Sequence, residues 1–258
     1  MPGESIYRVG SIDTKLLTAG KGQSVLFLHG GGGLPPWNSF FDRLSQQYEV
    51  LLPEHPGFGT DRHAEQIRSM SDLAMYYLDF LDGLDREHVH LVGHSLGGWA
   101  AAEVATRNCS RLASLTLIAP AGLRVKGIPA GDNFIWSPEE TIRNLYHDQK
   151  LAEAILSRPL TEDDADRQLT NRFMAARLGW EPRWFSPQLE RWLHRIQVPS
   201  LLIWGRDDKV LPCAYADLWE MHVPKMKKRL ISDCGHLPHI EIPDETAETI
   251  LSFLGALS

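Results

Sequence analysis

A tight turn between a strand and a helix at residues 93–98 constrains this chain more than any other feature. The apolar run at 89–92 predicts a buried strand, and the small residues at 99–105 predict a helix. Between them the sequence reads Gly-His-Ser-Leu-Gly-Gly. A Gly-x-Ser-x-Gly turn in this setting is typical of a nucleophile elbow, where strained backbone angles push the serine hydroxyl out of the sheet edge. We therefore expect Ser95 to attack a carbonyl carbon.

Short apolar runs recur along the chain and predict strands that are buried on both faces of a sheet. They cover residues 24–29, 49–53, 88–92, 114–119, 200–205 and 228–232. Helical spacing at 71–84, 96–107 and 244–257 fills some of the gaps between them. Residues 6–19 suggest an added antiparallel hairpin. Strands that alternate with helices predict an α/β fold with a mostly parallel, doubly wound sheet.

The alternation stops after Pro120. Residues 122–196 have a helical pattern that is rich in aromatic side chains. A structureless loop of this length is improbable in a compact domain, so we expect a helical cap over the carboxyl ends of the strands, where ligands bind in open α/β sheets. The expected division is a core of residues 1–121 and 197–258 with a cap of residues 122–196. Some cap aromatics should line a pocket, and we expect Trp136, Trp180 and Trp184 to do so.

A serine nucleophile needs a base within hydrogen-bond reach and an acid that orients the base. His236 follows the last predicted strand and comes directly after a glycine that allows a sharp turn, so it is the expected base. The acid should follow the strand at 200–205, where both Asp207 and Asp208 qualify by chemistry. The order Ser, Asp, His along the chain is that of α/β-hydrolases.

The oxyanion of a tetrahedral intermediate needs backbone N–H donors, each worth roughly 3 kcal/mol. One donor is expected from Leu96, which follows the nucleophile at a helix N-terminus. The second is expected from the glycine-rich loop at 30–33, where the backbone can approach a substrate oxygen closely.

Five short motifs resemble a known superfamily. They are His-Gly-Gly-Gly at 29–32, His-Pro-Gly-Phe-Gly at 55–59, the turn at 93–98, Trp-Gly-Arg-Asp-Asp at 204–208 and Cys-Gly-His at 234–236. Together they resemble the α/β-hydrolase superfamily over the whole chain except the expected cap. The resemblance implies an α/β-hydrolase fold in which Asp208, three residues after the strand's final glycine, is the acid. It also implies that Gly31 is the second oxyanion donor.

Related dehalogenases and epoxide hydrolases use aspartate where this chain has Ser95, so the resemblance argues against both activities and implies acyl transfer to water. We expect a Ser-His-Asp hydrolase that cleaves a small or medium carboxylic ester, lactone or thioester through an acyl-enzyme. The substrate-binding residues should be the three cap tryptophans and neighbours of the reacting groups, namely Gly32, His94 and Leu237. No metal or organic cofactor is expected.

Two alternatives stay open. The first is a carbon–carbon bond hydrolase of meta-cleavage diketones, whose relatives share the 204–208 motif but often carry Asn before the serine and Trp after the histidine. In that case Arg172, Arg177 or Arg183 of the cap could bind a substrate carboxylate. The second is a ligand receptor of the same fold that turns over slowly.

Composition limits the partners. The net charge of -7 and the absence of a long basic run argue against nucleic acid. Three cysteines give no disulfide framework, and we see neither a signal peptide nor an apolar span. We therefore expect a cytoplasmic protein with a small ester-like substrate and no membrane contact, and homo-oligomer formation stays open.

Overall fold

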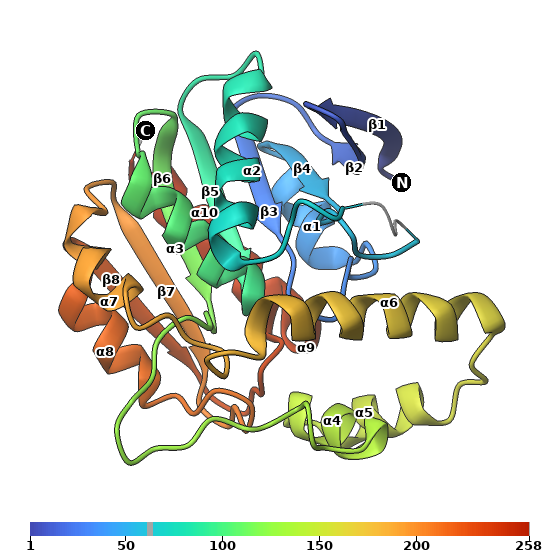
Figure 1. The fold of residues 1–258 in the computed structure, drawn as a ribbon. Helices are drawn as coiled ribbons and strands as arrows, with labels where there is room; N and C mark the ends of the chain where they lie inside the picture. The colour runs from blue at the N-terminus through green and yellow to red at the C-terminus, as the bar shows by residue number, and fades with distance from the viewer. Residues whose placement is uncertain (61–63, 258) are drawn as a thin grey trace.

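A twisted sheet forms the centre of the molecule (Figure 1). The computed structural model describes residues 1–60 and 64–257, and within them eight strands form one sheet in the order β1-β2-β4-β3-β5-β6-β7-β8. The strands are β1 Gly3–Val9, β2 Ile12–Ala19, β3 Ser24–Leu28, β4 Glu49–Pro53, β5 Val89–His94, β6 Leu112–Ile118, β7 Ser200–Gly205 and β8 Met226–Ile231. β1 pairs antiparallel with β2 and β2 with β4, whereas the pairs from β4 to β8 are parallel. The predicted mostly parallel sheet with an N-terminal hairpin is confirmed.

Helices cover both faces of the sheet. Alternate side chains of a strand point to opposite faces, so Leu26 and Leu91 belong to one core and Phe27 and Val92 to the other. The first face carries α2 Met70–Gly83, α3 Leu96–Arg107 and α8 Tyr215–His222. The second carries α1 Ser39–Ser45 and α10 Pro243–Gly255, which pack against each other. Parallel strands covered in this way bury both faces, which explains their continuous apolar runs.

The segment between β6 and β7 is helical. It contains α4 Pro138–Leu145, α5 Gln149–Leu156, α6 Glu162–Gly179, α7 Leu189–Trp192 and the short 3-10 helix η1 Leu193–Arg195. Side chains fix the starts of the first three helices: Ser137 forms a capping box with Glu140, and Asp148 and Thr161 each accept a backbone N–H. Figure 1 shows α6 beside the lower part of the sheet, with α4 and α5 below α6. We keep the name cap for residues 122–196, whose bounds stay a prediction.

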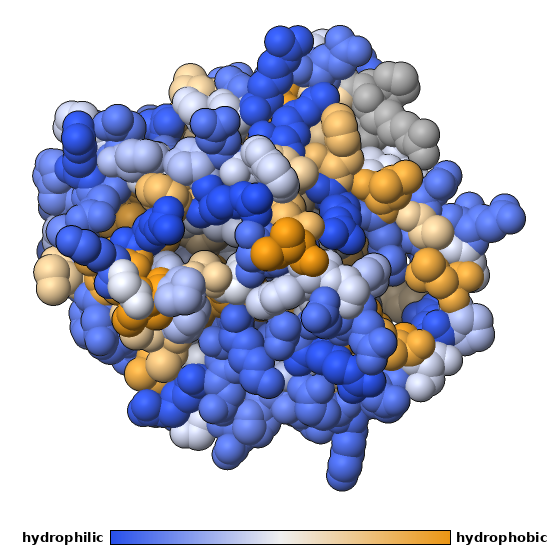
Figure 2. Space-filling view, turned by 60° about the horizontal axis from the view of Figure 1, so that its bottom comes forward, coloured by the Kyte–Doolittle hydropathy of each residue, from blue (hydrophilic) through white to orange (hydrophobic). Residues whose placement is uncertain are grey.

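The outer surface of the cap is mostly hydrophilic with separated hydrophobic side chains, as the view from that end shows (Figure 2). Several large apolar residues of the cap are exposed, among them Ile135, Leu160, Leu169, Phe173 and Trp180. The cap aromatics therefore divide between its interior and its surface. Along residues 1–60 and 64–257, no helix combines the length and apolarity needed to cross a bilayer.

Candidate active site

Ser95 occupies a strained turn between β5 and α3. Its backbone lies at φ 53° and ψ -115°, a conformation that is unfavourable for a residue with a Cβ. The Ser95 N–H donates to the Ile118 carbonyl oxygen at 3.0 Å, which ties the turn to the end of β6. Close packing also holds the turn, because a Cβ on Gly97 would lie 2.1 Å from the Leu28 carbonyl oxygen. The sequence-predicted elbow geometry is thus present, and the Ser95 side chain is only partly buried.

The side chains of Ser95, His236 and Asp208 form one hydrogen-bonded chain. His236 Nδ1 lies 2.7 Å from Asp208 Oδ2, and His236 Nε2 lies 2.9 Å from Ser95 Oγ. Because an ionised carboxylate only accepts hydrogen bonds, Nδ1 must carry the ring proton when the imidazole is neutral. Nε2 is then free to accept the proton of the Ser95 hydroxyl. Three residues that lie far apart in the sequence are thus brought together.

The Asp208 carboxylate is fixed on both of its oxygens. Oδ1 accepts the backbone N–H groups of Val210 and Leu211, both at 2.8 Å, while Oδ2 faces His236. The Asp208 side chain is fully buried and that of His236 is 3% exposed. Asp207 instead places its half-exposed carboxylate 3.0 Å from Nδ1 of His147. Of the two candidate acids, the structure brings Asp208 to His236.

The loop that carries His236 is held from the cap and from α9 Pro238–Glu241. The His236 N–H donates to the Leu145 carbonyl oxygen at 2.8 Å, at the end of α4. One oxygen of Glu241 accepts the N–H of Gly235 and the other accepts the N–H of Asp148. The position of the imidazole therefore depends on contacts that join cap and core.

His94, expected to contact substrate, lies behind His236. His94 is 4% exposed, and its Nε2 donates to the His236 carbonyl oxygen at 2.9 Å. Burial and the neighbouring His239 and His236 hold the pKa of His94 well below its ordinary value, so the ring stays neutral. The structure thus gives His94 a contact with the base loop.

Gly31 lies beside Leu96 at the open side of the turn. A Cβ on Gly31 would meet side-chain atoms of Ala175, Trp184 and Leu96 at 3.4, 3.6 and 3.9 Å. Leu96 is the first residue of α3, so its N–H has no carbonyl within the helix to bond. Among the described residues, no backbone hydrogen bond uses the N–H of Gly31 or Leu96. Both donors remain available for a ligand oxygen near Ser95, where the helix dipole favours negative charge.

Two buried histidines support the glycine loop. The backbone N–H of His55 donates to His29 Nε2 at 2.8 Å, so the His29 proton is on Nδ1, which donates to the Gly30 carbonyl oxygen at 2.7 Å. Burial lowers the pKa of His29 to about 4 and that of His55 well below its ordinary value. We did not single out this pair for such a role from the sequence, although His29 and His55 open two of the quoted motifs.

The three cap tryptophans differ in position. Trp184 is 8% exposed, stacks on Phe134 with a centroid distance of 4.8 Å, and is the tryptophan that reaches Gly31. Trp180 is 52% exposed and lies under the guanidinium of Arg183. Trp136 is partly buried and packs against Gly131.

The two remaining candidates for substrate contact flank the site. Gly32 is exposed and Leu237 is partly buried. A further residue near them, Asn171 of α6, was missed in the sequence. It hydrogen-bonds both Gly32 and Gly59 and so joins the cap to two loops of the core.

One group of side chains has the spacing of a metal site. His147, Asp207 and Asp233 can bring one ligand atom each to within 4.8 Å of one another, and all three are exposed. His147 already contacts both carboxylates through its two ring nitrogens, at 3.0 and 3.8 Å. A bridging imidazole accounts for this cluster without an ion.

The chain is similar in sequence and in structure to known hydrolases. A family model described as alpha/beta hydrolase fold matches residues 23–243. The chain is 28% identical to the 2-hydroxy-6-oxo-6-(2'-aminophenyl)hexa-2,4-dienoic acid hydrolase of Metapseudomonas resinovorans, over 97% of this chain and 90% of that protein. A solved membrane phospholipase A is 25% identical with a TM-score of 0.80, over 99% of this chain and 86% of that one. A meta-cleavage product hydrolase from Pseudomonas fluorescens IP01 is 24% identical with a TM-score of 0.83, over 100% of this chain and 99% of that one.

Proposed function

We propose that this chain, which belongs to the alpha/beta hydrolase fold family and is a hydrolytic enzyme, cleaves a carboxylic ester, lactone or thioester with Ser95 as nucleophile. The observation that carries this proposal is the continuous hydrogen-bonded chain from Ser95 through His236 to Asp208. A hydroxyl is a weak nucleophile at neutral pH unless a base takes its proton during attack. His236 Nε2, at 2.9 Å, is within reach to do so.

In the acylation step, the Ser95 oxygen bonds to the substrate carbonyl carbon while its proton moves to His236 Nε2. The carbonyl double bond opens to give a tetrahedral intermediate with an anionic oxygen. Asp208 accepts a hydrogen bond from the Nδ1–H group and stabilises the imidazolium that forms. When the carbonyl reforms, the leaving alcohol or thiol takes the proton from Nε2 and an acyl-enzyme remains.

The N–H groups of Gly31 and Leu96 hold the anionic oxygen in this proposal. Support comes from the closeness of the two residues and from the fact that neither N–H bonds to another described backbone group. Donors of this kind stabilise the intermediate more than the ground-state carbonyl. The acyl-enzyme is then hydrolysed by a water that loses its proton to His236, and Ser95 recovers its hydrogen as the acid leaves.

The substrate portion next to Ser95 should be apolar. Trp184 and Ala175 lie against the glycine loop, and Trp184 is fixed by a hydrogen bond from Nε1 to the Asn133 side chain at 3.0 Å. A rigid aromatic wall favours an aromatic or branched acyl group by excluding water from it. We propose direct substrate contacts for Trp184, Gly32 and Leu237, and an indirect role for His94.

A second candidate is hydrolysis of the carbon–carbon bond of a 2-hydroxy-6-oxo-dienoate. The observation that favours it is the 28% identity, over almost the whole chain, to an enzyme named for that substrate class. Against it, two cap arginines are placed elsewhere: Arg183 pairs with Asp132 at 2.5 Å, and Arg177 lines a hollow whose lining does not include Ser95. Arg172, which donates to the Phe134 carbonyl oxygen, remains of the three arginines considered for the substrate carboxylate.

Parallel turnover assays separate the two candidates. We expect p-nitrophenyl esters, aryl lactones or acyl thioesters to be hydrolysed over many turnovers, and 2-hydroxy-6-oxo-6-phenylhexa-2,4-dienoate to be hydrolysed slowly. Ser95→Ala should lower the rate by about 10⁴-fold or more, while Ser110→Ala, at an exposed loop position, should leave it unchanged. Faster hydrolysis of the dienoate than of any ester would favour the second candidate. Equal rates for wild type and Ser95→Ala would overturn both.

Location and partners belong to the same proposal. The three cysteines are free, with Cys234 buried, which fits a reducing cytoplasm. The proposed reaction takes its groups from the chain and from water, and its partner is a small ester-like molecule.

A further inference from the structure

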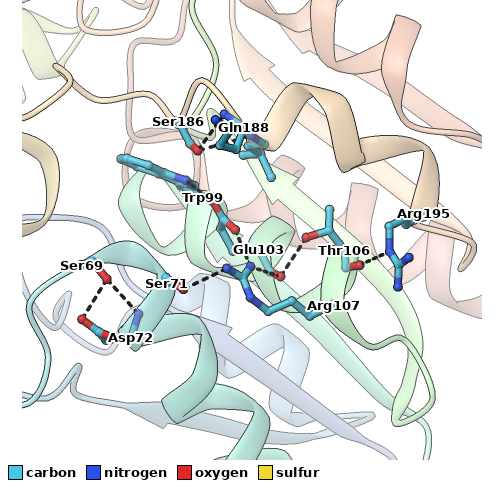
Figure 3. Close-up of polar contacts among 11 residues, drawn as sticks. Ser69, Ser71, Asp72, Trp99, Glu103, Thr106, Arg107, Ser186, Gln188 and Arg195 are labelled. Atoms are coloured by element: carbon cyan, nitrogen blue, oxygen red, sulfur yellow. Dashed lines mark hydrogen bonds and ion pairs between the residues drawn. The ribbon is translucent and has the colours of Figure 1, made fainter.

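A groove lies on the flank of the molecule, apart from Ser95. Its volume is about 740 Å³, and it lies between the start of α2, one side of α3 and the cap segment 177–195. Its lining includes none of Ser95, His236, Asp208 and Gly31. Figure 3 shows the polar contacts along its walls, with Trp99, Glu103 and Arg107 on α3. We call this hollow the flank groove.

Apolar side chains form much of the wall of the flank groove. Trp99, Leu178, Phe185, Leu189 and Trp192 all line it. Trp192 is 50% exposed, so part of its ring is accessible to a ligand in the groove. The volume lies in the range of sites that hold small organic ligands. The flank groove therefore offers an apolar bed of the right size for a ring or a short chain.

The charges in the flank groove are unbalanced. Arg68, Arg107, Arg177 and Arg195 line it together with Glu103 and Glu181. Glu103 is already satisfied, because it pairs with Arg107 and accepts the Trp99 indole N–H (Figure 3). This pair neutralises one arginine with one glutamate.

The three further arginines of the flank groove share one remaining carboxylate there, that of Glu181. Within the described part of the chain, Arg68, Arg177 and Arg195 have no carboxylate at ion-pair distance. Arg195 is oriented by a bond from Nε to the Thr106 carbonyl oxygen at 2.7 Å, and Arg68 by one from Nε to the Glu65 carbonyl oxygen at 3.0 Å. Their terminal nitrogens remain available as donors. This local positive charge contrasts with the net charge of -7 for the whole chain.

Two of these arginines lie between the flank groove and a second hollow. Arg68 and Arg177 also line a second hollow of about 450 Å³ together with Glu65, so they stand where the two hollows meet. The N-terminal residues of α2, Met70 and Ser71, line the flank groove as well.

We propose that the flank groove is a second binding site, for a small organic anion with an aromatic or aliphatic body, such as an aryl carboxylate. A guanidinium binds a carboxylate through two parallel N–H donors, which gives both attraction and orientation. The body of the ligand packs between Trp99 and Trp192 while its carboxylate meets Arg68, Arg177 or Arg195. The ligand chemistry is the same whether the carboxylate comes from the proposed reaction or from elsewhere, and the site does not depend on Ser95.

Calorimetric titration tests this site without turnover. The probes are 2-naphthoate and its neutral analogue 2-naphthamide, titrated into Ser95→Ala protein. We expect 2-naphthoate to bind at least about tenfold more tightly than 2-naphthamide. In the same background Arg68→Gln/Arg177→Gln should weaken 2-naphthoate about tenfold, and Arg195→Gln should weaken it severalfold. Arg158→Gln, at an exposed cap arginine outside the groove, is the matched control and should change nothing.

The proposal is overturned if 2-naphthoate does not bind, or if its affinity is the same in Ser95→Ala and in the arginine double variant. Titrating 2-naphthoate into wild-type protein before and after phenylmethylsulfonyl fluoride treatment tests whether the ligand binds at Ser95. Unchanged 2-naphthoate affinity in treated protein supports a site separate from Ser95, and loss of binding contradicts it. Since these measurements need no hydrolysis, the proposed function and the second site can fail independently.

Discussion

The side-chain amide of Asn171 donates a hydrogen bond of 2.8 Å to the carbonyl oxygen of Gly32, the residue after the proposed oxyanion donor Gly31. The amide oxygen of Asn171 accepts the backbone N–H of Gly59 at 2.7 Å. One side chain of α6 therefore fixes the glycine loop relative to the 55–59 loop. Because an oxyanion hole works only when its donors are already in place, this bridge should affect the rate of the reaction.

Asn171→Ala should lower kcat by about tenfold, because a small displacement of Gly31 weakens its bond to the developing oxyanion. KM and the unfolding midpoint should change little, since the side chain lies at the cap–core junction. Asn171→Asp keeps the acceptor for Gly59 but loses the donor to Gly32, and should lower kcat to a similar extent. Steady-state ester kinetics check both variants, with Thr170→Ala as the neighbouring control. An unchanged kcat in both Asn171 variants would show that the loop holds its position without the cap.

The two adjacent aspartates give a matched pair. Asp208→Asn should reduce kcat by about 10⁴-fold, because an amide can hold the imidazole in the wrong tautomer. Asp207→Asn should stay within about threefold of wild type, since its exposed carboxylate contacts His147 and not His236. Ester hydrolysis by the two purified variants checks this. Comparable losses at both positions would contradict Asp208 as the orienting acid.

Gly97→Ala should destabilise the protein by about 3 kcal/mol or more, because the new methyl group would meet the Leu28 and His29 carbonyl oxygens at 2.1 and 2.4 Å. Backbone atoms cannot move aside as a flexible side chain can. Gly255→Ala is the control: its Cβ meets nothing within 4 Å at the end of α10, and stability should stay equal or rise slightly. Urea unfolding midpoints measure both changes. A Gly97→Ala midpoint equal to that of wild type would mean that the elbow is looser than its packing indicates.

The protein should lose stability as the pH falls below about 6.5. Burial lowers the pKa of His29 to about 4 and that of His239 to about 3, so the folded state resists protonation that the unfolded state accepts. Between these folded-state values and about 6.5 the unfolded state binds more protons, and each fully buried histidine should remove roughly 2 to 3 kcal/mol from about pH 7 to about pH 4.5. Urea unfolding across this range measures the effect.

His239→Phe isolates one contribution to this acid sensitivity. The His239 ring packs on Phe27 and Phe40, and within residues 1–60 and 64–257 its Nδ1 finds no hydrogen-bond partner, so an aromatic hydrocarbon fits the site. The variant should flatten the pH dependence of stability, whereas His194→Gln, at an exposed position, should leave it unaltered. A dependence as steep as that of wild type in His239→Phe would assign the acid sensitivity to other groups.

The sheet and the reacting side chains were accessible from the sequence for a physical reason. Strands covered on both faces leave continuous apolar runs, as β3, β5 and β7 do, and parallel strands bring their following loops to a single edge. Ser95 follows such a run and His236 follows the parallel edge strand β8, so their meeting at one edge could be expected. The choice between Asp207 and Asp208 needed the resemblance, because both follow β7.

Other features depend on contacts that no local pattern records. α1 and α8 are short, with 7 and 8 residues, and were not predicted. Asn171 lies in a largely polar helix where nothing distinguishes it from its neighbours. The flank groove brings together α2, α3 and the end of the cap, which lie far apart in the sequence. The sequence does not distinguish the three cap tryptophans, because tertiary packing determines that Trp184 is buried and Trp180 is exposed.

The cap leaves and rejoins the sheet between two strands that are direct neighbours. β6 and β7 pair from Leu115 with Ser200 to Ile118 with Ile203, so the register of the two strands does not depend on the cap between them. A different cap inserted between β6 and β7 would leave the strand order unchanged, provided that it supplied a carbonyl oxygen for the His236 N–H and an amide for the glycine loop. Substrate preference can therefore diverge among descendants of such a chain while the bond-breaking step is inherited unchanged.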